Sequence, residues 1–145
     1  MSVPRHYPPV PLLGVSVVCH RNDDVLLIKR SKPPYQGCWS LPGGLVDLGE
    51  PLKAAAEREL FEETGVHADL GAPVDTFDSI HKDGDGRVAS HFVLVVFSGP
   101  YVSGTVDAGD DAADAGWIPL SGLENLETTP GTPPRIRRIL GLDQM

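Results

Sequence analysis

The chain has 145 residues, of which 41% are apolar and 22% are charged, values typical of one globular domain. Its 20 acidic residues against 12 Lys and Arg give a net charge of -8, which argues against broad binding of nucleic acid through phosphates. A small phosphorylated ligand stays compatible with this charge, because bound metal ions invert the local sign.

The N-terminal residues, 1–10, are rich in proline and predict an extended arm ahead of a single domain at 11–145. They contain no apolar stretch of the kind found in signal peptides, and no later run is long enough to span a membrane. Two cysteines, Cys19 and Cys38, are too few for a disulfide framework and are expected to pack as free thiols. We therefore expect a cytoplasmic protein with no membrane partner and no nucleic-acid partner.

The first half of the domain predicts strands followed by a glycine pair. Residues 12–20 and 25–30 indicate two strands joined by a polar turn, which is the pattern of a hairpin. A loop with two prolines then leads to a short strand at 39–41. The next residues, Pro42-Gly43-Gly44, predict unusual backbone angles.

The central helix is predicted to begin near Pro51 and to stop at Gly65, since proline suits the first helical position and glycine the position past the end. Its apolar stripe consists of small and aliphatic side chains, namely Leu52, Ala55, Ala56 and Leu60. Glu59 and Glu63 project among these apolar residues, so this helix is expected to direct carboxylates toward the body of the domain.

The second half predicts further strands and a last helix. The expected elements are strands at 74–80, 88–97 and 117–120, a helical turn at 121–125, and a helix from Thr132 to about 140 with Thr132 as its N-cap. The arginines of that helix, Arg135, Arg137 and Arg138, are expected to form a solvated face. The predicted fold class is α/β, with a mixed β-sheet sandwiched between helices.

Three glutamates, Glu59, Glu62 and Glu63, lie within little more than one turn at the end of the central helix. The helix dipole is negative at this end, and residues three and four apart share a face, so the arrangement is unfavourable without a neutralising cation. We interpret the cluster as a divalent-metal site; the alternative is an exposed acidic helix end.

The spacing around this cluster resembles the Nudix box. Gly44, then Glu50, then Arg58-Glu59-Leu60, then Glu62-Glu63-Thr64-Gly65-Val66 match the motif at every defined position, and Trp39 to Gly43 and Trp117 to Leu120 also resemble features of this family. The resemblance implies hydrolysis of a nucleoside diphosphate linked to another group X. It implies Mg²⁺ or Mn²⁺ as cofactor and a small-molecule nucleotide as substrate.

The resemblance also implies roles for individual residues. Glu59, Glu62, Glu63 and the backbone carbonyl of Gly44 correspond to metal ligands, whereas Glu50 and Arg58 correspond to supporting residues. For the general base, relatives often use an acidic residue in a loop before a strand with tryptophan. Asp111 is our first candidate, with Asp110 beside it and Glu63 as the other candidate, although a solvated Gly/Asp loop fits the same pattern.

Three further residues are candidates for substrate binding: Arg30, His91 and Phe92. Arg30 ends the second predicted strand, where its guanidinium can reach a phosphate, although an exposed strand-end arginine is equally compatible. His91 and Phe92 can line a base or sugar pocket; the alternatives are an ordinary strand histidine and a core aromatic residue.

The resemblance points to ADP-ribose or a nucleotide sugar as substrate. A proline that marks one ADP-ribose subgroup is not found at the expected distance after the box, where Ile80, His81 and Lys82 stand. A MutT-like nucleoside triphosphate pyrophosphohydrolase therefore stays open, as does a Nudix domain that senses a nucleotide without cleaving it. The N-terminal arm and the habits of relatives also suggest a possible homodimer.

Overall fold

The computed structural model describes residues 3–109 and 112–142, and strand β1 (Leu12–Arg21) runs through its centre. One edge of β1 pairs in parallel with β7 (Val88–Ser103), from Leu12 opposite Phe92 to His20 opposite Pro100. The other edge is shared by two antiparallel partners. The hairpin strand β2 (Asp24–Arg30) pairs with the end of β1, and β4 (Gly43–Leu45) pairs with its beginning.

The remaining strands extend this mixed sheet on both sides. β6 (Asp75–Lys82) and β5 (His67–Ala68) pair with β7, whereas β3 (Trp39–Ser40) and β8 (Ala112–Pro119) pair with β2. All of these pairs are antiparallel, so β1 and β7 form the parallel pair of an otherwise antiparallel sheet.

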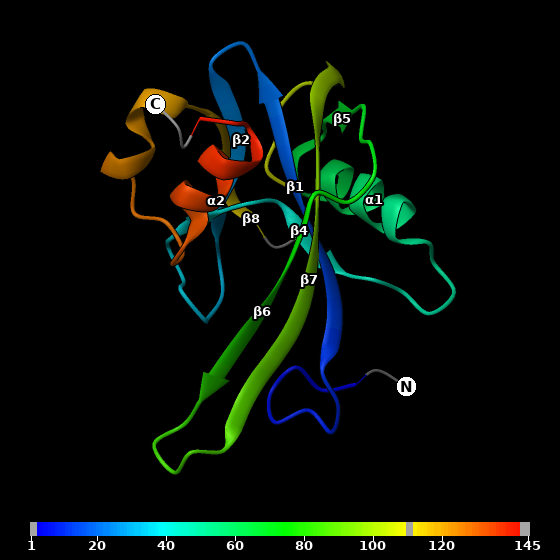
Figure 1. Cartoon of the computed structure of the whole chain (residues 1–145), viewed down its shortest axis with the longest axis vertical. Coiled ribbons are helices and arrows are strands. Elements are labelled where there is room, and N and C mark those ends of the chain that lie inside the picture. Colours follow the sequence, from blue (N-terminus) through cyan, green and yellow to red (C-terminus); the bar gives the residue numbers. More distant parts are fainter. Residues whose placement is uncertain (1–2, 110–111, 143–145) are drawn as a thin grey trace.

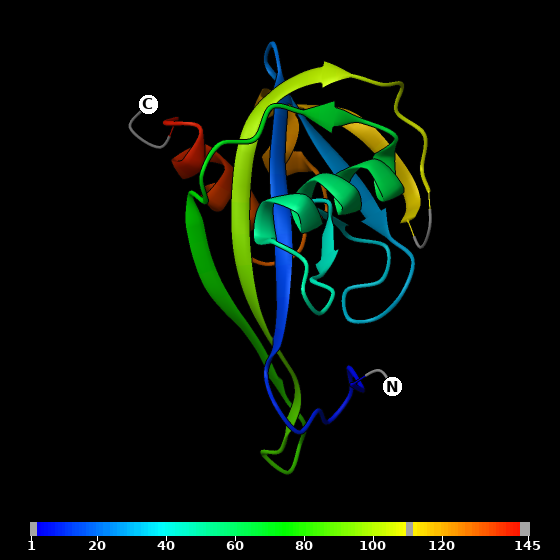
Figure 2. The same ribbon diagram turned by 90° about the vertical axis from the view of Figure 1, so that its right-hand side faces the viewer.

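Helices cover both faces of the sheet. Helix α1 (Leu52–Thr64) lies on one face, and α2 (Thr132–Ile139) with the 3₁₀-helix η1 (Leu120–Asn125) lies on the other, as Figures 1 and 2 show. The predicted α/β/α sandwich with a mixed sheet is confirmed. Within the described residues, neither α-helix combines the length and the apolar character needed to cross a bilayer.

Successive side chains of each strand point to opposite faces of the sheet, and apolar side chains on both faces form two apolar layers. The layer under α1 joins Ala55, Ala56 and Leu60 to strand residues such as Val15, Val17, Cys19, Val95 and Phe97. The layer under α2 and η1 contains Val18, Val25, Leu27, Val96, Leu123 and Ile136. Cys19 is fully buried, and burial raises the pKa of its thiol to about 11, as expected for a packed rather than reactive cysteine.

Helix α1 follows its predicted boundaries closely. Gly65 adopts the left-handed conformation, with φ of 76°, and its N–H donates to the Phe61 carbonyl, which ends the helix. The predicted stripe is confirmed: Ala55, Ala56 and Leu60 are buried. Pro51 differs from the expectation, because it is the N-cap, with an extended backbone, rather than the first helical residue.

The glycine pair does not adopt the unusual angles that its sequence predicts. Gly43 and Gly44 lie in the extended strand β4, and neither belongs to the glycines with positive φ. Glycine is required here by close packing, since a Cβ on Gly43 would overlap the Val15 carbonyl oxygen. The extended conformation follows from pairing with β1, which the local sequence does not reveal.

Several boundaries in the second half differ from prediction. β7 continues to Ser103 rather than ending at Phe97, and β8 begins at Ala112 in a segment predicted as loop. Pairing with β5 and β2 stabilises these stretches despite their polar and Gly-rich composition. Thr132 is the first residue of α2 instead of its N-cap, a position taken by Gly131 with φ of 80°.

The N-terminal residues also differ from a simple extended arm. Tyr7 has φ of 50°, in the left-handed region, and its N–H donates to the Ala89 carbonyl at 2.8 Å. The segment therefore folds back on the β6–β7 hairpin of its own chain, at the lower end of the molecule in Figure 1.

We predict that Leu60→Ala lowers the free energy of unfolding by about 2–5 kcal/mol, because it leaves a cavity where α1 packs on the sheet. Leu60 is 1% exposed, whereas Leu48, in the loop before α1, is 106% exposed. Leu48→Ala is therefore a matched control, expected to change stability by less than about 0.5 kcal/mol. Urea unfolding of both variants measures the difference; equal effects would contradict the packing of α1 described above.

Candidate active site

An open cavity of about 1020 Å³ is lined by residues from many parts of the chain: the N-terminal segment, β1, the end of β2 with the loop after it, β3 and β4, α1, the strands β6 and β7, and the start of α2. Six of the predicted site residues line it, namely Arg30, Gly44, Glu59, Glu62, Glu63 and Phe92. A smaller hollow of about 360 Å³, beside Arg21, Tyr101 and Trp117, contains none of the predicted acids.

Arg58 is the centre of the acidic cluster. Its guanidinium donates to both oxygens of Glu50, at 2.7 and 2.9 Å, and to Glu59 Oε1 at 2.7 Å. It also donates to both oxygens of Glu62, at 3.3 Å each, and to the Leu45 carbonyl at 3.0 Å. One cation therefore fixes three carboxylates relative to β4. The supporting role of Arg58 in a metal site stays a prediction.

The paired Glu50 carboxylate is strongly stabilised in its ionised form. The main cause of this stabilisation is the hydrogen bonding that Glu50 accepts from Arg58. The N–H of Asp47 donates a further hydrogen bond to Glu50 at 3.0 Å. Together they lower the pKa of Glu50 from 4.5 to about 2. The carboxylates around Arg58 raise the pKa of its guanidinium above the usual value.

Two of the glutamates contact the glycine pair directly. Gly43 donates its N–H to Glu63 Oε1 at 2.6 Å. A Cβ on Gly44 would overlap the Glu59 carboxylate, so this carboxylate lies against the Gly44 backbone. The glycines thus let the end of α1 approach β4 closely enough for its carboxylates to meet the strand backbone.

The three glutamates differ in exposure. The Glu59 side chain is 15% exposed, whereas that of Glu62 is 39% exposed. The predicted inward orientation therefore holds well for Glu59, while Glu62 lies at the rim of the cavity. This difference follows from the helix, since Glu59 lies three and four residues after the buried Ala56 and Ala55 and so shares their face.

The donor set fits a hard divalent cation. All of its candidate ligands are oxygens, from Glu59, Glu62, Glu63 and the Gly44 carbonyl. Within the described ranges, no group of three or more His, Cys, Asp or Glu side chains is placed so that it could hold a metal ion. Mg²⁺ does not require such a group, because it is commonly held by one or two carboxylates, waters and substrate phosphates.

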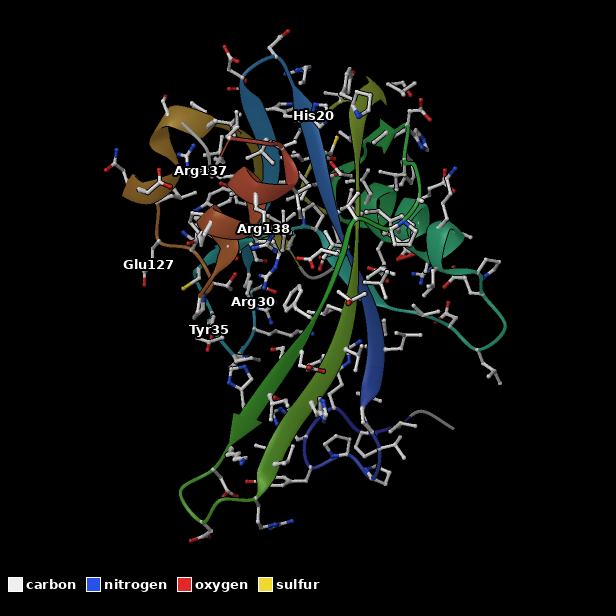
Figure 3. The ribbon with its side chains drawn as sticks, viewed as in Figure 1. His20, Arg30, Tyr35, Glu127, Arg137 and Arg138 are labelled. Carbon is white, nitrogen blue, oxygen red and sulfur yellow. The ribbon has the colours of Figure 1, made fainter. Side chains whose placement is uncertain are left out.

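Two of the three predicted substrate-binding residues line the cavity. Arg30 reaches the cavity from the end of β2, and its Nε donates to the Pro34 carbonyl at 2.8 Å, beside the loop that carries Tyr35 (Figure 3). Phe92 lines the cavity from β7. His91, its neighbour, is not among the lining residues, and its Nε2 lies 3.7 Å from Asp78 Oδ1.

The candidate base Asp111 and its neighbour Asp110 lie outside the described residues. The adjacent backbone approaches the end of α1, because the N–H of Gly109 donates to the Glu63 carbonyl at 3.0 Å. The role of Asp111 stays a prediction.

Sequence reasoning missed Arg135 as a cavity residue. Its guanidinium lies 3.5 Å from the centroid of the Phe77 ring, and its Nε is 3.6 Å from Asp75 Oδ2. Burial lowers the pKa of Arg135, so this arginine does not belong to the solvated face that we predicted. Arg137 and Arg138 do remain at the surface, paired with Glu124 and Asp75. The local sequence around Arg135 did not indicate that its side chain turns toward the cavity.

Comparison with known proteins agrees with this geometry. Residues 10–139 match the model of the NUDIX domain, and the chain belongs to this family.

Two curated relatives carry the names of different activities. An ADP-ribose pyrophosphatase of Methanocaldococcus jannaschii is 34% identical over 116 residues, covering 80% of this chain and 66% of that protein. The 8-oxo-dGDP phosphatase NUDT18 of Homo sapiens is 30% identical over an alignment of 152 positions, covering 99% of this chain and 43% of that protein. This chain therefore spans less than two thirds of the length of either relative.

A solved structure supports the same assignment. The crystal structure of a MutT NUDIX hydrolase from Burkholderia pseudomallei superposes with a TM-score of 0.70 at 29% identity, covering 92% of this chain and 98% of that one.

The low pKa of Glu50 predicts a specific acid dependence of stability. Because the pKa is lower in the folded chain than in the unfolded chain, the ionised carboxylate favours folding above about pH 5. This contribution is lost as the pH falls from about 5 to about 2. We expect the urea midpoint of the wild type to fall more steeply across this window than that of Glu50→Gln. The exposed Glu57 offers the control Glu57→Gln, which should follow the wild type; a Glu50→Gln profile parallel to the wild type would contradict the pairing.

Proposed function

We propose that this chain hydrolyses the diphosphate bond of a nucleoside diphosphate linked to another group, with ADP-ribose or a nucleotide sugar as first candidate substrate. One observation carries the proposal: Glu59, Glu62 and Glu63 line a single cavity at the negative end of α1, with Arg58 and the Gly43–Gly44 backbone against them. The ADP-ribose candidate is supported by the name of the Methanocaldococcus relative.

The cofactor in this proposal is Mg²⁺ or Mn²⁺, since members of the family generally use divalent metal ions. Glu59, Glu62, Glu63 and the Gly44 carbonyl would hold it. When bound, such an ion neutralises the diphosphate and lowers the pKa of an attacking water.

The chain's own residues then have three tasks. Arg58 keeps Glu59 and Glu62 in place, and the Gly43 N–H fixes one oxygen of Glu63. A carboxylate, Asp111 or Glu63, accepts a proton from the attacking water while the oxygen of that water bonds to phosphorus. The bond from that phosphorus to the bridging oxygen breaks, and the departing phosphate takes the electron pair. Arg30 and Phe92, which line the same cavity, would help to orient the substrate.

A second candidate is hydrolysis of a nucleoside triphosphate or an oxidised nucleotide, as in MutT-like enzymes. Two observations favour it: the missing proline of the ADP-ribose subgroup, and the relative named 8-oxo-dGDP phosphatase. The same acids and the same cofactor would serve, so the substrate alone separates the two candidates.

We predict that hydrolysis requires the metal and the acidic cluster. A panel of ADP-ribose, nucleotide sugars, dinucleoside polyphosphates and 8-oxo-dGTP should show release of nucleoside monophosphate with Mg²⁺ or Mn²⁺ and none with a chelator. Glu62→Gln and Glu63→Gln should each lower kcat/KM by at least about 100-fold, since even residues that only support a metal ligand contribute 10- to 100-fold.

Glu57→Gln is the matched control, because it removes the same charge from the exposed side of the same helix and should leave kcat/KM unchanged. Turnover that survives both chelation and loss of Glu62 or Glu63 would refute the proposal. Tight binding of ADP-ribose without any turnover would identify a nucleotide sensor instead.

A further inference from the structure

We propose that the smaller hollow, at the far end of β1 from the acidic cluster, is a second ligand site and binds a phosphate group. This hollow, here named the Arg21 hollow, has a volume of about 360 Å³ and is lined by Arg21, Tyr101, Gly104, Thr105, Val106 and Trp117. Its ligand is inorganic phosphate or the phosphate of a small phosphomonoester. The inference goes beyond the proposed function and does not depend on it.

The Arg21 hollow is separate from the candidate active site. No residue that the structure describes lines both the hollow and the larger cavity. The larger cavity reaches β1 no further than Ser16, whereas Arg21 is the last residue of this strand. At about 3.3 Å per residue, the two positions are roughly 17 Å apart along β1. In Figures 1 and 2 this end of β1 lies at the upper end of the molecule, away from the β6–β7 hairpin.

Two aromatic rings hold the guanidinium of Arg21 in place. Its Cζ atom lies 4.2 Å from the centroid of the Trp117 ring and 5.0 Å from that of the Tyr101 ring. The two rings meet edge to face, with centroids 5.6 Å apart and an angle of 83° between their planes. Both distances are within the range at which an aromatic face attracts a guanidinium. An arginine held in this way loses little further freedom when it binds a ligand.

The protein does not use the hydrogen-bond donors of this arginine. Arg21 lies opposite Asp24 where β1 pairs with β2, a position in which opposite charges commonly interact. Nevertheless, Arg21 makes no hydrogen bond or ion pair with Asp24 or with any other residue that the structure describes. Stacking occupies the face of the guanidinium, so the N–H groups at its edge stay available to an anion.

Further donors without acceptors lie around the same hollow. Within residues 3–109 and 112–142, the backbone N–H groups of Gly104, Thr105 and Val106 donate to no acceptor. The same holds, within these ranges, for the indole N–H of Trp117. The Tyr101 hydroxyl donates to the Gly104 carbonyl at 2.7 Å, which fixes the loop beside the rings. Because the six lining residues include one cation and no acid, the hollow suits an anion.

This set of donors favours a phosphate over a carboxylate. The donors come from the end of β1, from β8 and from the loop after β7, so they approach the hollow from three segments of the chain. A phosphate has acceptor oxygens in three dimensions, whereas the two oxygens of a carboxylate lie in one plane that a single guanidinium satisfies. A phosphomonoester also carries close to two negative charges at neutral pH, against one for a carboxylate.

Titration with inorganic phosphate, with a chelator and without nucleotide, tests the inference. In a proton–nitrogen correlation spectrum the indole N–H peak of Trp117 should shift as phosphate is added. The chain has two tryptophans, and the peak of Trp39, which does not line the hollow, is the internal reference. Arg21→Ala should raise the Kd of phosphate about tenfold, as expected for loss of a charge-assisted hydrogen bond.

Two further probes identify the source of the phosphate group. A lower Kd for ribose 5-phosphate than for inorganic phosphate would identify a phosphomonoester as the ligand, and the reverse order would identify free phosphate. Acetate, a carboxylate, should bind more weakly than either. Acetate binding as tightly as phosphate would overturn the inference.

Arg87→Ala is the matched control, because Arg87 also stacks on an aromatic ring, that of Tyr7, but does not line the hollow. It removes the same charge and should leave the Kd of phosphate unchanged. Arg21→Lys keeps the charge without the guanidinium fork, should raise the Kd severalfold, and replaces Arg21→Ala if thermal unfolding shows that the alanine variant is not folded. A Trp117 peak that does not move at millimolar phosphate, or equal Kd values for the wild type and the folded Arg21 variant, would refute the phosphate site.

Discussion

The contact between Arg58 and its surrounding carboxylates is the interaction on which the candidate site depends. Three glutamates at the negative end of a helix repel one another and the helix dipole. Arg58 offsets this by donating to Glu50, Glu59 and Glu62 and, through the Leu45 carbonyl, by joining α1 to β4. A lysine would not reproduce this arrangement, because a single ammonium cannot serve acceptors that lie in the fixed directions of a guanidinium fork.

Close packing of backbone makes this electrostatic arrangement possible. Gly43 fits against the carbonyl of Val15, and Gly44 leaves space for the Glu59 carboxylate. Ala55 and Ala56 have the same effect on the helix, because their small side chains allow α1 to lie close to the sheet. Sheet pairing, helix packing and carboxylate placement therefore converge on one short stretch of strand, β4. The site is precise because rigid elements, rather than a flexible loop, set most of it.

Local patterns predicted much of this structure. Alternation and turn residues located β1, β2 and the core of β7, and the proline and glycine around α1 gave its ends within a residue. The acidic cluster was also readable, because its spacing is unfavourable without a cation. The sequence could not predict features that depend on residues far away in the chain. β4 and β5 are strands because of β1 and β7, and Arg135 enters the cavity because α2 packs over Phe77. The return of the N-terminal segment to its own hairpin likewise depends on Asp83 and Ala89, far away in the chain.

The parallel pairing of β1 with β7 has a consequence for how the molecule is assembled. Leu12 pairs with Phe92, and the intervening chain contributes β2, β4 and α1 before this partner exists. During synthesis, β1 and α1 leave the ribosome with an open sheet edge until the later strand arrives. Such long-range closure slows folding and exposes apolar edges to aggregation. Chaperone dependence and yield should therefore respond to mutations in β7 more than to mutations in the acidic cluster, even though the catalytic role is proposed for the cluster.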